Sequence, residues 1–234
     1  MIKPSDINFF TMNFIQALET ELIIHRNATK AKQMEAYMKY NFSFLGIQAE
    51  ERKAILHHLW KKHKAEIKSN FRDICWILFT KKEREFHYCG IEIIVKEINK
   101  NYLPDDGSLI EKWITTNSWW DSVDVIAKYL LGNYLLQFPD KTLNVIQHFS
   151  NADNMWLSRS AILFQLGYKK NTNFELLKSE CEKHKQSNAF FIQKAIGWAL
   201  REYGKYNPIA VQNYVENSNL KPLSRKEALR NIVK

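Results

Sequence analysis

The chain is poor in the residues that interrupt regular structure. Its 234 residues include only 7 Gly and 5 Pro, and because a turn-rich β protein needs many such residues, this scarcity favours helices. Its 3 cysteines, Cys75, Cys89 and Cys181, are scattered and odd in number. That spacing fits neither a disulfide framework nor a cysteine-based zinc motif. The cysteine content therefore favours a reducing, cytoplasmic environment.

Long hydrophobic runs and common cofactor motifs are also missing. No apolar run reaches transmembrane length, and the start from Met1 to Asp6 lacks the apolar core of a signal peptide. Neither a glycine-rich phosphate loop nor a paired-histidine zinc motif is present, since the adjacent His57 and His58 would diverge on a helix. We therefore expect a cytoplasmic protein with no membrane partner, no metal site and no cofactor.

What the chain has instead is positive charge and a sizeable hydrophobic fraction. Lys and Arg number 34 against 25 Asp and Glu, for a net charge of +9, and 45% of the residues are hydrophobic. The length suits one domain or two. The basic excess favours nucleic acid, an acidic partner or an anionic membrane surface, but by itself it does not choose among them.

Amphipathic segments recur with a period of about 35 residues, a spacing typical of helix-pair repeats. The aromatic or apolar residues that open them are Phe86, Trp120, Trp156, Phe191 and Leu223. Shorter apolar-periodic segments lie between them, at 109–115, 141–149, 174–181 and 208–215. The pattern predicts one all-α domain, with a helical cap over about residues 1–70 and stacked helix pairs over about 71–234. Such a stack curves to give a concave binding surface.

Local signals predict where several of these helices start and end. Capping boxes are expected at Thr80 to Glu83 and at Ser224 to Glu227. Asn207 followed by proline predicts a helix start, and Gly167 and Gly204 lie where helices should end.

The segment from Ser118 to Asp124 sets two indoles and two carboxylates at the start of a predicted helix. Because residues four apart share a helix face, Trp120 and Asp124 should stand together and could hold a cationic group. Trp119 should point to the core. Asp121 fits a capping box with Ser118, whereas Asp124 has no such local duty, although exposed helix carboxylates are common.

Three long segments, 119–124, 156–166 and 190–203, together with 37–39, 44–48 and 220–228, resemble the bacterial AlkD-type DNA glycosylases. The resemblance covers most of the chain, in order. It implies a HEAT-like repeat solenoid with a concave basic groove, which excises cationic N3- or N7-alkylated purines from double-stranded DNA. It further implies a monomer that works without a metal and without flipping the base.

The resemblance also assigns roles to single residues. Trp120, Asp124 and Trp198 match the catalytic pocket of the family. Arg159 matches a DNA-binding groove arginine near that pocket and is expected, like Arg201, to hold backbone phosphate. The positions that match DNA-binding residues of the groove or its rim are Tyr37, Gln48, Phe190, Phe191 and Arg201. One departure is Gly167, which stands where a lysine is expected, so that a backbone contact is missing or is taken by Lys169 or Lys170.

Packing offers an alternative for several of these residues. Trp198 and the pair Phe190 and Phe191 could belong to the core, and Arg159, three residues after Trp156, could cover that indole with its stem. For the whole protein, the alternatives to an enzyme are a non-catalytic DNA-binding repeat protein and a protein-binding solenoid.

Overall fold

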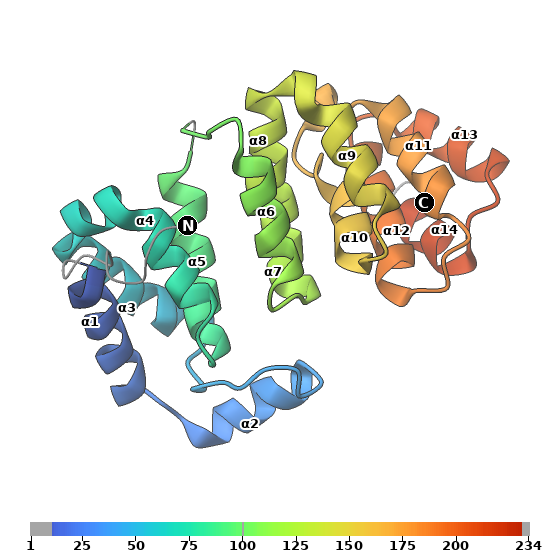
Figure 1. Cartoon of the computed structure of the whole chain (residues 1–234). Coiled ribbons are helices and arrows are strands. Elements are labelled where there is room, and N and C mark those ends of the chain that lie inside the picture. The colour runs from blue at the N-terminus through green and yellow to red at the C-terminus, as the bar shows by residue number, and fades with distance from the viewer. Residues whose placement is uncertain (1–10, 100, 231–234) are drawn as a thin grey trace. The chain divides into compact units, whose positions relative to one another are not determined.

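The structure, a computed structural model, describes residues 11–99 and 101–230. The prediction about a signal peptide at Met1 to Asp6 therefore concerns residues outside the described ranges. The described residues form helices joined by connectors (Figure 1). This confirms the all-α prediction. An isolated parallel bridge links Ser43 to Glu83. No helix in these ranges is long and apolar enough to cross a membrane.

The chain divides into two compact units, residues 1–101 and residues 102–234. The first contains α1 (Thr11–Ile24), α2 (Ala28–Tyr37), α3 (Ala49–Lys62), α4 (Lys64–Phe79) and α5 (Arg84–Glu97). Helix α1 packs on α3 and α4, and α4 packs on α5, around fully buried side chains such as Leu18, Leu56 and Ile74. The expected division into a cap and repeats near residue 70 stays a prediction.

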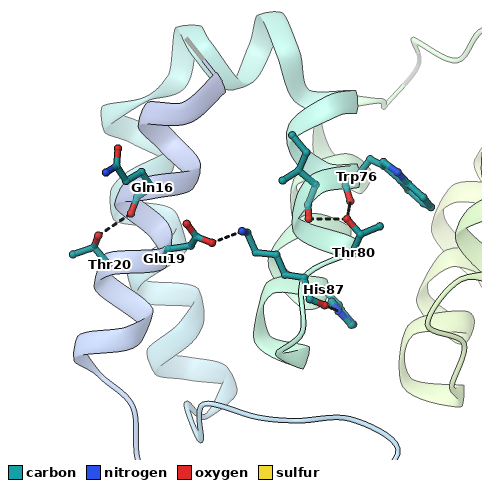
Figure 2. Close-up of polar contacts among 8 residues, drawn as sticks. Gln16, Glu19, Thr20, Trp76, Thr80 and His87 are labelled. Carbon is teal, nitrogen blue, oxygen red and sulfur yellow. Dashed lines mark hydrogen bonds and ion pairs between the residues drawn. The ribbon is translucent and has the colours of Figure 1, made fainter. Parts of the chain in front are cut away.

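Polar contacts join the elements of this first unit (Figure 2). Lys81, in the connector between α4 and α5, forms an ion pair with Glu19 of α1. The carbonyl of Lys81 accepts a hydrogen bond of 2.6 Å from His87 Nε2, and Arg84 Nη1 lies 3.0 Å from His87 Nδ1. The connector is therefore held to both α1 and α5.

The second unit consists of consecutive helix pairs. Its α-helices are α6 (Asp106–Thr115), α7 (Trp120–Val125), α8 (Gly132–Gln137), α9 (Thr142–Asn151), α10 (Met155–Leu163), α11 (Phe174–His184), α12 (Phe190–Gly204), α13 (Pro208–Asn217) and α14 (Pro222–Leu229). The π-helical segment η2 (Ile126–Leu131) joins α7 to α8, and the short 3-10 turns η3 (Pro139–Lys141) and η4 (Lys169–Asn171) lie in connectors. All four shorter segments expected from the sequence lie in helices, α6, α9, α11 and α13, and each is followed by a second helical segment, as the period of about 35 predicts.

The second helices of successive pairs pack on one another. Helix α10 contacts α7, η2 and α12, and α12 contacts α14. The approach of α12 to α14 requires a glycine at Gly197, because a Cβ there would lie 2.4 Å from Glu227 Cβ and 2.9 Å from the carbonyl oxygen of Ser224. Residues of this unit also form a buried hydrophobic core that includes Cys181 and Leu200. The stack therefore fixes the relative positions of α7, α10 and α12.

Two of the predicted helix boundaries are confirmed. Asn207 Oδ1 accepts a hydrogen bond of 3.1 Å from the backbone N–H of Ala210 at the start of α13, and α12 ends at Gly204.

The capping boxes, in contrast, are wrong. The Thr80 hydroxyl donates to the carbonyls of Trp76 and Ile77 at the end of α4 (Figure 2), at 3.1 Å in both cases. The Ser224 hydroxyl donates to the carbonyl of Gln193, and that of Ser118 donates to the carbonyl of Ile114. These hydroxyls satisfy carbonyls of other turns and leave the N-termini of their own helices without a side-chain cap.

Candidate active site

Aromatic rings join the N-terminal ends of α7, α10 and α12. Trp119, which precedes α7, lies 5.7 Å from Trp156 and 5.2 Å from Phe191, and Trp156 lies 5.1 Å from Phe191, between ring centroids. We call these three residues the aromatic cluster. Tilted and edge-to-face pairs at such distances stabilise beyond the area they bury. Trp119 is thus a packing residue, as expected, and it connects three successive pairs.

One helical turn into α7, Asp124 forms a two-point ion pair with Arg159 of α10. Arg159 Nε donates to Asp124 Oδ1 at 2.7 Å, and Arg159 Nη2 donates to Oδ2 at 2.9 Å. Arg159 Nη1 also donates to the backbone carbonyl of Phe191 at the start of α12. A guanidinium used in this way fixes the plane of the carboxylate as well as its position.

The pair is largely removed from water. The Arg159 side chain is 5% exposed and that of Asp124 is 13% exposed. Burial raises the pKa of Asp124 above its usual value, the Arg159 guanidinium opposes this rise, and the nearby Asp121 charge adds to it. Because each oxygen of Asp124 accepts a bond from a permanently charged guanidinium, the geometry is that of an ionised carboxylate.

The same helices carry the two predicted tryptophans. Trp120 is the first residue of α7 and is partly exposed, one turn before Asp124. Trp198 lies in α12, where it is partly exposed and packs with one side against the buried core. The Trp198 indole therefore has a packed side and an accessible one, and the Trp120 indole is partly accessible.

The structure changes the interpretation of Arg159. As a groove arginine it was expected to hold phosphate, yet it is buried and three of its nitrogen atoms already donate to Asp124 or Phe191. The alternative, in which the stem of Arg159 only covers the Trp156 indole, does not account for these hydrogen bonds either. Arg159 is arranged to orient Asp124, and the side chain of Phe191 belongs to the aromatic cluster.

The remaining predicted DNA-binding residues of this unit lie on α12. Phe190 is the first residue of the helix and is 59% exposed. Arg201 lies near the other end, where its Nη1 donates to Glu227 Oε2 at 2.6 Å. Lys194 Nζ contacts the other oxygen of Glu227 at 2.7 Å, and hydrogen bonds from Lys194 and then Arg201 lower the pKa of Glu227. Arg201 thus shares an ionised carboxylate with a second cation.

Tyr37 and Gln48 belong to the first unit. Tyr37 ends α2 and is 68% exposed, and Gln48 immediately precedes α3. The connector between these helices is held by Glu85, a fully buried carboxylate on α5 that sequence reasoning missed. It accepts hydrogen bonds from the backbone N–H groups of Leu45, Gly46 and Ile47, at 3.0, 2.9 and 3.1 Å. Glu85 therefore fixes the backbone that leads into Gln48.

The pairing of Asp124 with Arg159 was also missed. A signal for it existed, because the two residues are 35 positions apart and therefore occupy neighbouring repeats. As for metal binding, the described ranges contain no group of three or more His, Cys, Asp or Glu residues that could hold an ion.

Comparisons with known proteins match most of the chain. Residues 18–232 match the protein family described as "DNA alkylation repair enzyme". The chain is similar to a solved structure from Enterococcus faecalis described as a "predicted DNA alkylation repair enzyme", with 32% identity and a TM-score of 0.81 over 89% of this chain and 97% of that one.

Two further solved structures share the fold. AlkD2 from Streptococcus mutans is 17% identical, with a TM-score of 0.58 over 87% of this chain and 100% of that one. The smu.31 protein from Streptococcus mutans UA159 is 13% identical, with a TM-score of 0.55 over 77% of this chain and 98% of that one. A search of curated proteins finds no match.

Proposed function

Since this chain belongs to the family of DNA alkylation repair enzymes, we propose that it is a monofunctional DNA glycosylase. Its substrate would be double-stranded DNA that contains N3- or N7-alkylated purines, and its reaction the hydrolysis of the N-glycosidic bond. The observation that carries the proposal is the carboxylate of Asp124 on α7, which Arg159 of α10 holds by two hydrogen bonds. Trp120 on α7 and Trp198 on α12 are both partly exposed.

The chemistry of such a substrate matches what this site offers. An N3- or N7-alkylated purine carries a formal positive charge, and it leaves as a neutral base when the glycosidic bond breaks. Positive charge then develops on the sugar. A fixed negative charge close to the sugar stabilises that transition state more than the ground state, which is the requirement for catalysis.

Asp124 can supply that charge while it is bound to Arg159. A carboxylate offers about four lone-pair positions, and the two bonds from Arg159 use one on each oxygen. The other positions remain for the attacking water, with Asp124 as the group that orients it. Arg159 acts as a positioning residue: it holds the carboxylate and has no part in bond breaking.

The tryptophans contribute less. A cation over an indole gains about 0.5–2 kcal/mol, depending on desolvation. With about 1.4 kcal/mol for each factor of ten, one such contact gives an acceleration of about two- to thirty-fold. In this proposal, Trp120 and Trp198 bind the cationic nucleotide and exclude water from it, while Asp124 provides most of the rate.

A weak glycosidic bond also removes the need for detailed base recognition. Enzymes that read a base by its edges turn it out of the duplex into a snug pocket, at a cost of a few kcal/mol. We propose that this protein instead approaches the sugar and its neighbouring phosphates with the base still stacked. It would act as a monomer and without a metal ion.

Product analysis tests the proposal. The protein in excess over methylated duplex DNA should release N3-methyladenine or N7-methylguanine, which chromatography identifies, and should leave abasic sites in unbroken strands. The same release should occur in EDTA, and unmethylated duplex is the control. A protein that binds the duplex but releases no base would be a non-catalytic DNA-binding protein. Loss of release in EDTA would contradict the metal-free mechanism.

A further inference from the structure

Lys128 continues the helix face that carries the candidate site. It follows Asp124 by four residues, as Asp124 follows Trp120, and residues at this spacing lie above one another on a helix. Lys128 is part of the π-helical segment η2. Such segments are rare and occur frequently at functional sites.

The side chain of Lys128 lies against Gly167, in the turn that follows α10. A Cβ at Gly167 would be 3.2 Å from Lys128 Cε and 3.9 Å from its Nζ. Gly167 has a φ of +96°, a conformation that residues with a side chain rarely adopt. The exposed glycine therefore leaves the space that the lysine stem occupies, and the ammonium group reaches the rim of the turn.

Among the described residues, Lys128 has no carboxylate partner, and its ammonium nitrogen lies over the ring of Tyr129, 4.7 Å from the ring centroid. Several other lysines of the same unit are neutralised by ion pairs, namely Lys178, Lys185, Lys194 and Lys205. Lys128 is half-buried. A half-buried ammonium group without a counter-charge is stabilised when it binds an anion.

We propose that Lys128 binds a backbone phosphate of the DNA beside the lesion. This inference rests on the proposed function, because it takes DNA as the ligand. The charges at the site give the reason. Arg159 forms an ion pair with Asp124, and this pair has no net positive charge with which to hold a phosphate. An ammonium group offers three donors and suits a phosphate oxygen.

A salt titration of binding to undamaged duplex tests this assignment. Lys128→Met keeps the apolar stem over Gly167 and removes the charge, whereas Lys128→Arg keeps the charge. Lys178→Met is the matched control, because it removes one lysine charge from a pair on α11. Thermal unfolding checks that each variant is folded, and Lys128→Gln is a second variant that removes the charge.

Loss of one phosphate contact lowers the slope of log affinity against log salt by about 0.9. Lys128→Met should show that change, so its affinity falls about 3.5-fold less than that of the wild type between about 50 and 200 mM salt. Lys128→Arg and Lys178→Met should keep the wild-type slope. If the wild type shows a steep slope and Lys128→Met and Lys128→Gln share it, the role of Lys128 is refuted while the proposed function stands. An equal loss in Lys178→Met would also refute it, since net charge would then be the cause. A wild type without salt-dependent binding would contradict the proposed function itself.

Discussion

The ion pair between Asp124 and Arg159 should show strong energetic coupling when its partners are replaced singly and together. Removal of one partner of a buried pair leaves an uncompensated charge and costs about 3–5 kcal/mol. Asp124→Asn leaves the Arg159 guanidinium, 5% exposed, without its counter-charge. Arg159→Met keeps much of the volume and leaves the Asp124 carboxylate alone. Each single variant should therefore lose a large share of a stability that is typically about 5–15 kcal/mol.

The double variant carries no buried charge at this position. It should be less destabilised than the sum of the single variants, with a coupling free energy of about 1–3 kcal/mol. Urea unfolding followed by circular dichroism measures all four proteins. The control is Lys178→Met, whose ion pair with Glu175 is exposed and should contribute about 0–1 kcal/mol. Additivity of the two single variants within about 0.5 kcal/mol would refute the argument.

The destabilisation caused by each single variant should depend on pH in a different way. Burial raises the pKa of Asp124, and Arg159 opposes that rise, so Arg159→Met should raise the pKa further. When the pKa of a carboxyl group is higher in the folded than in the unfolded state, burial of the ionised carboxylate destabilises the folded protein. This destabilisation is full at higher pH and is relieved as the pH falls through the folded-state pKa. The destabilisation by Arg159→Met should therefore shrink on mild acidification. That by Asp124→Asn should not, because the guanidinium stays charged. The opposite pattern would show that Asp124 is not the group left uncompensated.

Three further variants probe single contacts. Trp120→Phe should slow single-turnover base release and leave the salt dependence of DNA binding unchanged; a change only in the salt slope would make Trp120 a backbone contact. Arg201→Ala should lower that salt slope by about one unit if Arg201 holds a phosphate, and an unchanged slope would mean that Arg201 serves only its bond to Glu227. Glu85→Gln should destabilise the protein by about 1.5–3 kcal/mol in urea unfolding, because a neutral amide replaces a carboxylate that accepts three backbone bonds. Glu85→Gln should also weaken DNA binding if Gln48 contacts DNA. An unchanged stability of this variant would contradict the role of Glu85.

The sequence was sufficient to predict the helix pairs, because each pair repeats the same apolar pattern and its boundaries carry local signals. Asn207 shows this well: its side chain caps α13 within its own turn. Ser224 shows the limit, because spacing suggested a cap while the hydroxyl donates to Gln193 on another helix. A pattern within one segment does not reveal a partner supplied by the neighbouring repeat.

The same limit applies to the candidate site. The position of Asp124 one turn after Trp120 follows from helical spacing alone, and the structure places both on α7. The separation of 35 residues was a signal that Asp124 and Arg159 lie in neighbouring repeats, but their pairing also depends on how α10 packs against α7. The contact of Lys128 with Gly167 likewise depends on a turn with positive φ. The family prediction, which depended on long segments in order, is confirmed.

Single-turnover base release by Asp124→Asn, compared with the wild type on a duplex that contains one N7-methylguanine, tests the central claim most directly. The variant keeps the shape of the side chain and removes the negative charge. Loss of a fixed electrostatic contact to a transition state typically costs about a hundred- to a thousand-fold in rate, and we expect a loss of at least about ten-fold for Asp124, with DNA affinity retained. Release at the wild-type rate by a folded, DNA-bound Asp124→Asn protein would contradict the account, because the catalytic charge would then lie elsewhere.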